Sequence, residues 1–167
     1  MAAYAFVPRN LLHMKSWIHA GITMITAMFM HGSLLHLLSN MLFLWIFGDN
    51  VEDKLGHFNY LIAYTVFGIF AGLCQAFIGV FSKIAIIGAS GAIAGVMGAY
   101  FLFFPNARIR TIVLIFPVPL SAYLFLGLWF IYQVWYSLAG GPGVAWYAHI
   151  GGFLAGVYYA KKFVKRG

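Results

Sequence analysis

Residues 88–100 read GASGAIAGVMGAY, a run of mostly small and apolar side chains with one serine, Ser90, near its beginning. The run shows no strand-like alternation of polar and apolar residues, so it predicts a helix. Small residues recur at Gly91, Gly95 and Ala99, every fourth position, which leaves one helix face nearly bare and lets a neighbouring helix approach closely. The serine is therefore either a small residue that lets helices pack closely, or a nucleophile that the small neighbouring residues leave accessible to a substrate.

The rest of the chain has the composition of a membrane protein. It has 167 residues, of which 63% are hydrophobic and 8% are charged, and its mean hydropathy is +0.91. A soluble domain usually carries about 25% charged residues. The net charge of +7 fits basic loops on the cytoplasmic side of a membrane, and no basic patch with interleaved aromatics predicts a nucleic-acid partner. The one cysteine, Cys74, forms no disulfide framework by itself, and residues 1–10 lack the pattern of a cleavable signal peptide.

Apolar runs long enough to cross a bilayer predict an all-α membrane protein. A crossing helix needs roughly 20 apolar residues, and backbone in lipid must satisfy its own hydrogen bonds. Residues 16–30 are apolar but short and carry a histidine, so we expect them to lie in the interface rather than to cross. Pro117 and Pro119 predict a late start for the fourth span. The five expected spans cover about 33–48, 58–81, 86–104, 111–138 and 145–163.

The distribution of lysine and arginine predicts the orientation. Seven basic residues fall on one side of the expected spans and three on the other, and the side with more is usually cytoplasmic. The first, third and fifth spans then run from outside to inside. The seven are Lys54, Arg108, Arg110, Lys161, Lys162, Lys165 and Arg166, and the three are Arg9, Lys15 and Lys83.

This topology brings four polar residues into one layer near the outer surface. Ser90 lies about one turn into the third span, and His149 lies about one turn into the fifth. His36 and Asn40 lie early in the first span and, four residues apart, share one helix face. The acidic residues all fall in the loop after the first span, at the opposite surface: Asp49, Glu52 and Asp53.

Such a layer holds the groups that acyl transfer requires. Ser90 supplies a nucleophilic hydroxyl, and His149 supplies a base of suitable basicity. Asn40, His36 and the backbone N–H of Ser90 supply donors for a developing oxyanion. Because no aspartate lies at this surface, the mechanism expected is a Ser–His dyad.

Each of these residues also has a structural interpretation. A lone serine in a membrane helix often bonds a carbonyl of its own helix. His149 could be satisfied by a neighbouring carbonyl, and His36 and Asn40 could bond each other. His31, just before the first span, could simply fix the adjoining loop.

Three motifs together resemble the rhomboid intramembrane serine proteases. They are HGSLLHLLSNMLFLWIFGDNVEDKLG at 31–56, GASGA at 88–92 and AHIGG at 148–152. A lone GxSG motif would be weak, but the order and spacing of the three are specific. The resemblance covers roughly residues 16–163 and implies a rhomboid-like bundle of transmembrane helices, a single membrane domain over 1–167.

The resemblance implies roles for individual residues. It implies that Ser90 is the nucleophile, that His149 is the general base, and that Asn40 and His36 line the oxyanion hole. It implies single-span membrane proteins as substrates, cut near a small residue in a segment that unwinds easily, and neither a metal nor a cofactor. The residues that would shape the site without reacting are His31, Gly88 and Gly91.

This sequence departs from the family pattern in two ways. The family core has six spans, and residues 1–30 would correspond to the external loop that follows the first, so we expect that first span to be missing here. Some members place a tyrosine one turn after the nucleophile, stacked on the catalytic histidine, whereas this chain has Ala94. The orientation of the histidine is then expected to depend on another residue.

The sequence also bears on alternative functions. A catalytically inactive relative that binds membrane proteins or serves quality control is the main alternative. A transporter or channel is disfavoured because no charged residue lies deep in a span, and a zinc site because too few ligands are available.

The glycine-rich loop at 138–146 is expected to act as a flap that, with the fourth span, admits substrate from the side. The single-domain plan suggests a bacterial inner membrane, with the site facing outward.

Overall fold

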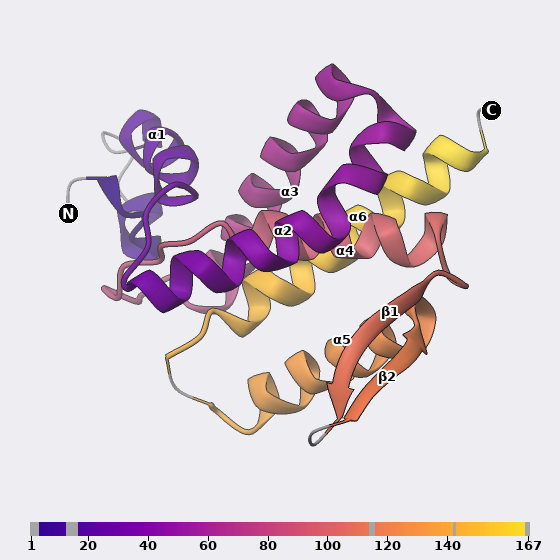
Figure 1. Ribbon diagram of the computed structural model, residues 1–167. Coiled ribbons are helices and arrows are strands. Elements are labelled where there is room, and N and C mark those ends of the chain that lie inside the picture. Colours follow the sequence, from indigo (N-terminus) through magenta and orange to yellow (C-terminus); the bar gives the residue numbers. More distant parts are fainter. Residues whose placement is uncertain (1–3, 13–16, 114–115, 142, 166–167) are drawn as a thin grey trace.

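The structure is a computed structural model that describes residues 4–12, 17–113, 116–141 and 143–165 (Figure 1). Its described part is a bundle of six α-helices with one two-stranded antiparallel hairpin. A short 3-10 helix at Pro8–Leu12 precedes them. In chain order the elements are α1 (Trp17–Ala27), α2 (Leu34–Leu55), α3 (His57–Ile78), α4 (Ser90–Phe103), β1 (Arg108–Val113), β2 (Phe116–Ser121), α5 (Ala122–Leu138) and α6 (Trp146–Val164).

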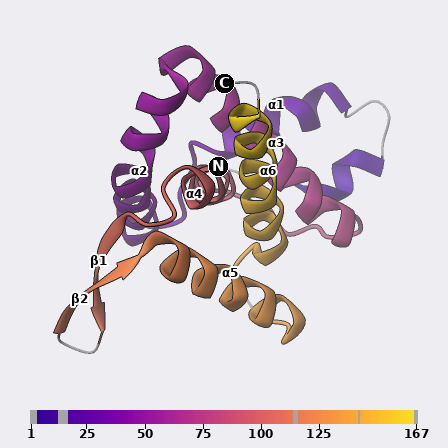
Figure 2. The ribbon, with the colours of Figure 1, turned by 90° about the vertical axis from the view of Figure 1, so that its right-hand side faces the viewer.

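Helix α4 is the centre of the bundle. Every residue from Gly91 to Tyr100 is buried, because the helix is small or apolar on all sides. It packs against α6, α3 and α2, and Figure 2 shows α4 surrounded by these three helices with α5 beneath it. At 14 residues it is about 21 Å long, shorter than a typical hydrocarbon core.

The stripe of small residues lets α4 and α6 come into direct backbone contact. A Cβ atom on Gly152 would overlap the carbonyl oxygen of Gly91, and one on Gly156 would overlap the carbonyl oxygen of Gly95. Only residues without a side chain fit these positions. The four-residue spacing noted in the sequence is thus a helix–helix contact, and it fixes how the first turns of α4 and α6 face each other.

The structure corrects the expected fourth span over 111–138. Its first part is the β1–β2 hairpin, in which Arg108 pairs with Ser121, and the helix begins only at Ala122. Pro117 and Pro119 lack the amide hydrogens that a helix interior needs, whereas a strand at the edge of a sheet tolerates them. Ser121 then caps α5, because its Oγ accepts a hydrogen bond from the Leu124 amide at 3.3 Å.

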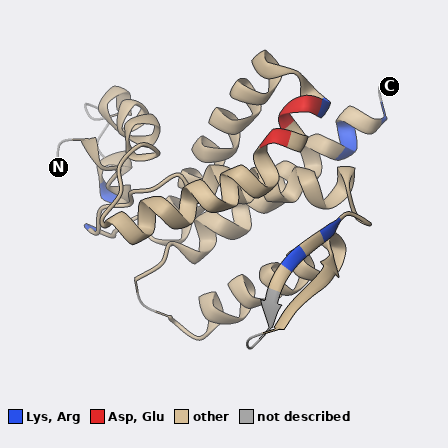
Figure 3. Cartoon of the chain, viewed as in Figure 1, with Lys and Arg blue, Asp and Glu red and all other residues tan. Residues whose placement is uncertain are grey.

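Two other boundaries differ from the expected spans. Helix α4 begins at Ser90 rather than at 86, so the serine is its first residue. Helix α2 continues to Leu55 rather than ending near 48, so the acidic residues lie on its last turns and not in a loop. There Glu52 Oε1 lies 2.7 Å from His57 Nδ1, across the turn at Gly56. Figure 3 shows charged residues at the two ends of the bundle and on the hairpin.

By length and composition, α2 and α3 are the two described helices able to cross a membrane. Helices α4 and α5 are apolar but shorter, and α6 carries Lys161 and Lys162 in its last turn. The expected count of five spans therefore stays a prediction. The 11-residue α1 is too short to cross, and it packs on α3 beside the N-terminal segment, where Phe6 pairs with Ile86.

Candidate active site

Ser90 and His149 meet where α4 and α6 begin. The serine is the first residue of α4 and the histidine lies one turn into α6, and both helices start at the same end of the molecule (Figure 1). The distance between Ser90 Oγ and His149 Nε2 is 2.9 Å, a hydrogen bond between residues 59 positions apart. The glycine contacts between α4 and α6 hold the helices close enough for it.

The start of α4 offers free donors beside the serine. Ala89 is the N-cap residue and makes no side-chain capping bond, and the first amides of any helix lack partners within the helix. The amide of Ser90 is one of them. Positive partial charge at a helix N-terminus favours an anion at this position.

Gly88 is shaped by its neighbour on α2. Its φ angle is +114°, a backbone conformation that side chains disfavour. A Cβ atom there would lie 2.8 Å from Nε2 of His36 and 3.7 Å from Nδ2 of Asn40. Glycine therefore brings the backbone before the serine directly against both residues. Gly91 instead faces away from them, toward Ala71 on α3.

Asn40 carries a buried and unpaired donor. Its side chain is 6% exposed, and its Nδ2 atom is among the buried polar atoms without a hydrogen-bond partner in the described residues. Leaving a buried amide N–H unpaired is costly, so such a group calls for an explanation. An oxygen atom of a bound substrate would satisfy it.

The serine, the histidine and both α2 residues line one cavity of about 490 Å³. This volume lies in the usual range for small-molecule and peptide pockets. Side chains of α2, α4, α5 and α6 and the loop after α5 contribute to its wall. The lining residues are His36, Ser39, Asn40, Phe43, Ile87, Ser90, Ile93, Met97, Trp129, Gly143, Val144, Ala145 and His149.

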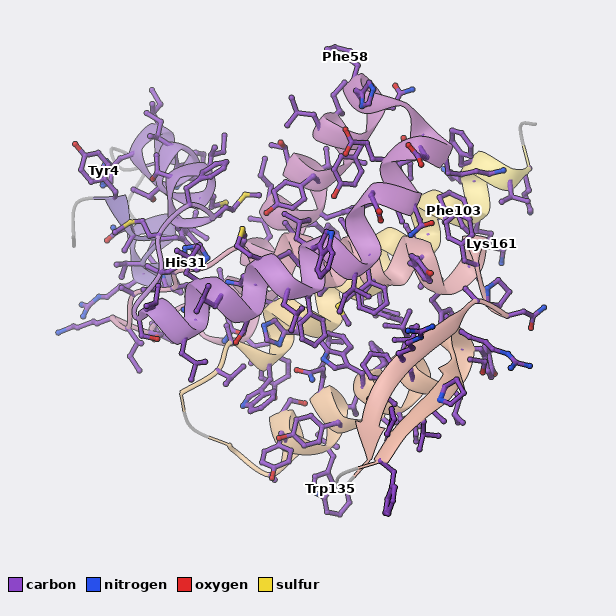
Figure 4. The ribbon with its side chains drawn as sticks, viewed as in Figure 1. Tyr4, His31, Phe58, Phe103, Trp135 and Lys161 are labelled. Carbon is purple, nitrogen blue, oxygen red and sulfur yellow. The ribbon has the colours of Figure 1, made fainter. Side chains whose placement is uncertain are left out.

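His31 lies beside the site rather than in it. Figure 4 places it next to the start of α2, and its ring packs edge-on against that of His36 at 5.1 Å between centroids. Burial lowers the pKa of His31 below the usual 6.5, and the neighbouring His36 lowers it further, whereas a backbone hydrogen bond at Phe29 acts in the opposite direction. The residue thus joins the loop before α2 to the helix.

Helix α5 supplies two contacts to His149 that the motifs do not reveal. Gln133 Oε1 lies 2.8 Å from His149 Nδ1, and Gln133 is only 3% exposed. The ring of Trp129, one turn earlier, lies 6.0 Å from the imidazole. The imidazole thus has contacts from α5, whereas residue 94 is a fully buried alanine. An amide inside an apolar span is a signal that could have pointed to Gln133.

Gln75 is a second amide that sequence analysis missed. Its Oε1 accepts a hydrogen bond of 3.2 Å from the Ala148 amide, in the first turn of α6. The same amide also donates to the carbonyl oxygen of Ala145 at 3.0 Å, so its hydrogen is shared between two acceptors. Gln75 therefore ties α3 to the residue that precedes His149.

The arrangement suits nucleophilic attack on a carbonyl. A hydroxyl contacts an imidazole, the imidazole contacts a third polar group, and Asn40 of the same cavity wall has an unpaired amide nitrogen. Within the described ranges, no three His, Cys, Asp or Glu side chains come together as metal ligands would.

The chain is similar to known proteins over nearly its whole length. The model of the Rhomboid domain family matches residues 17–166. Rhomboid protein 1, mitochondrial, of Saccharomyces cerevisiae is 32% identical over 165 residues, covering 93% of this chain and 46% of the yeast protein.

Two further relatives match shorter segments. RHOMBOID-like protein 6, mitochondrial, of Arabidopsis thaliana is 33% identical over 135 residues, 80% of this chain and 40% of that protein. Rhomboid protease GlpG of Yersinia pestis is 32% identical over 132 residues, 79% of this chain and 44% of that protein. The chain thus spans less than half the length of these relatives. With a domain match over nearly its whole length, this chain belongs to the rhomboid family and is an integral membrane protein.

Proposed function

We propose that this protein is an intramembrane serine endopeptidase that cleaves transmembrane segments with a Ser–His dyad. The observation that carries the proposal is the 2.9 Å contact between Ser90 Oγ and His149 Nε2 at the wall of a cavity of about 490 Å³. In this mechanism His149 takes the proton of Ser90 as its oxygen attacks the scissile carbonyl. It then returns the proton to the leaving amine.

The oxyanion formed in that step would lie among three donors. They are the unpaired Nδ2 of Asn40, the ring of His36 and the amide of Ser90. Donors that are already in position stabilise the developing charge without reorganisation. Water then enters through the cavity and hydrolyses the acyl-enzyme.

The names of the relatives support a protease without deciding the substrate. The Yersinia relative is named a rhomboid protease, while the yeast and plant relatives are named as mitochondrial rhomboid proteins. Mitochondrial relatives match this chain as well as the bacterial one, which weighs against the expected bacterial inner membrane. We therefore propose only that the protein crosses a membrane several times, without naming the membrane. Its site would face the side opposite Lys161 and Lys162.

Cleavage of a transmembrane test substrate in detergent tests the proposal. The wild type is compared with Ser90→Ala and His149→Ala, and the products are followed by mass spectrometry. We expect cleavage by the wild type and loss of at least about 10³-fold in both variants, as for other paired nucleophile and base residues. Equal cleavage by all three proteins would end the proposal.

The same proteins distinguish a protease from a non-catalytic family member. A serine-directed fluorophosphonate should label the wild type at Ser90 and leave Ser90→Ala unlabelled. His149→Ala should react far more slowly, because it lacks the base. An unreactive Ser90 in folded wild-type protein would favour the alternative, a binding or quality-control factor.

A further inference from the structure

We propose that Gln133 is a positioning residue that selects the tautomer of His149 required for catalysis, an inference that rests on the proposed function. No acidic residue lies at this end of the described bundle, and the neutral side-chain carbonyl of Gln133 occupies the position of a third group. It acts through His149 and does not touch the substrate or Ser90.

The contacts place Gln133 directly behind the imidazole. His149 Nε2 lies 2.9 Å from Ser90 Oγ, and His149 Nδ1 lies 2.8 Å from Gln133 Oε1. Ser90, His149 and Gln133 therefore form one line through the ring, contributed by α4, α6 and α5.

A second hydrogen bond determines which way the amide faces. Gln133 Nε2 donates to the carbonyl oxygen of Trp129 at 3.4 Å, one turn earlier on α5. If the amide were turned over, its oxygen would face that carbonyl oxygen, and two acceptors would lie together in a buried place. The Oε1 atom must then face His149, so His149 Nδ1 carries the proton that it donates.

This polarity sets the chemistry at the other side of the ring. A neutral imidazole has one N–H, so a proton on Nδ1 leaves the lone pair of Nε2 free to accept the Ser90 proton. With the opposite tautomer, Nε2 would donate to the serine oxygen and could not act as a base. Gln133 thus holds the ring in the reactive form and in the reactive orientation.

A neutral amide also suits the location. A carboxylate at position 133 would be a buried charge within a membrane domain, which is costly, whereas an amide accepts the same hydrogen bond without a charge. His36, which belongs to α2, is the other histidine of the cavity wall, whereas Gln133 belongs to α5.

The tautomer can be observed without any activity. Protein labelled with nitrogen-15 histidine, in detergent micelles above pH 7, gives imidazole spectra in which the protonated nitrogen of each neutral ring is identified. The signals of His149 are assigned by their absence from His149→Ala. We expect protonated Nδ1 in the wild type and a shift toward protonated Nε2 in Gln133→Met. Protonated Nε2 in the wild type, or an unchanged tautomer in Gln133→Met, overturns the proposal.

Kinetics then measures the consequence for catalysis. Gln133→Met keeps the length of the side chain but removes the acceptor, so we expect kcat to fall about tenfold with KM nearly unchanged. Gln133→Glu restores an acceptor and adds a charge that stabilises the imidazolium. The acid limb of its pH profile should therefore move to higher pH, with kcat recovered relative to Gln133→Met.

Ser137→Ala is the matched control. It removes another buried polar group one turn further along α5, a hydroxyl that donates to the carbonyl oxygen of Val134 and does not contact His149. It should leave the tautomer and the pH profile unchanged. A kcat of Gln133→Met equal to that of the wild type overturns the role of Gln133. If instead the wild type shows no cleavage dependent on Ser90, the proposed function fails, and the tautomer measurement still decides the geometry.

Discussion

At the scale of single residues, the proposed oxyanion donor Asn40 gives the most direct prediction. Its amide nitrogen is buried and has no hydrogen-bond partner among the described residues, whereas the amide of an exposed asparagine can bond to water. We expect Asn40→Ala to lower the cleavage rate by ~10²–10³-fold, as loss of one oxyanion donor does in soluble hydrolases. The measurement is kcat/KM on the test substrate. Unfolding in the same detergent serves as the control, and an unchanged rate in a folded variant would exclude Asn40 from the oxyanion hole.

His31 gives a second prediction, about pH. Its folded-state pKa is lowered below 6.5 by burial and by His36, so below pH 6.5 the unfolded chain binds a proton that the folded chain does not. This residue therefore leaves stability unaffected above that pH and reduces it as the pH falls below. Replacing it with glutamine should flatten the loss of thermal stability between about pH 7 and 5.

The control for this pH effect is His19→Gln, which removes an exposed histidine from α1. It should keep the pH dependence of the wild type. Identical slopes for His31→Gln and the wild type would show that another group causes any acid destabilisation.

At the scale of elements, the contact between α4 and α6 is what brings Ser90 and His149 together. A Cβ atom on Gly156 would overlap the carbonyl oxygen of Gly95, so Gly156→Ala should separate the helices and lower the free energy of unfolding by about 1–3 kcal/mol. Cleavage should fall as well, because the Ser–His distance depends on this packing.

The matched control is Gly127→Ala on α5. A Cβ atom there would meet no atom within 4 Å, so the variant should be neutral or up to about 1 kcal/mol more stable through its better helix propensity. Unfolding in mixed micelles, measured for both variants, checks the pair. Equal stabilities would mean that the backbone contact is dispensable.

The elements also show what a single sequence can and cannot predict. The motifs around Ser90 and His149 and the spacing of the glycines predicted which helices meet, because these signals lie within one or two turns of chain. The expected fourth span over 111–138 includes most of the β1–β2 hairpin, since Thr111, Ile112 and Val113 are as apolar on average as a span. Pro117 and Pro119 predict that the helix starts late, but they do not reveal the hairpin that precedes it.

Gln133 escaped prediction for another reason. Its contact with His149 joins α5 to α6, and nothing near Gln133 in the sequence resembles a motif. Such a residue becomes visible only when the crossing of two helices is known. The role of each predicted site residue, in contrast to its position, stays a prediction until the variants are measured.

At the scale of the whole molecule, α2 and α5 face each other across the mouth of the site. Helix α5 packs on α6 and α4, whereas its backbone stays clear of α2 throughout the described residues. The two helices are linked by the stacked rings of Phe47 and Phe125, 6.2 Å apart. The cavity occupies the space between them, which supports the expected entry of substrate from the side.

A cross-link between α2 and the loop after α5 tests this entry. The pair Ser39→Cys and Val144→Cys places cysteines at two exposed residues of the cavity wall, in a Cys74→Ala background. A short bismaleimide that joins them should abolish cleavage of the transmembrane substrate while a small fluorophosphonate still labels Ser90. Each single cysteine treated with the reagent is the control. Full cleavage by the cross-linked protein would rule out this route.

The indole rings beside His149 have one more consequence, for how the protein can be observed. Two of its five tryptophans, Trp129 and Trp146, lie 6.0 and 6.4 Å from the imidazole. A proton taken up by the imidazole would put a positive charge close to both indole rings. The intrinsic tryptophan fluorescence of the unlabelled protein should then change when His149 is protonated, so this step can be followed without an added probe.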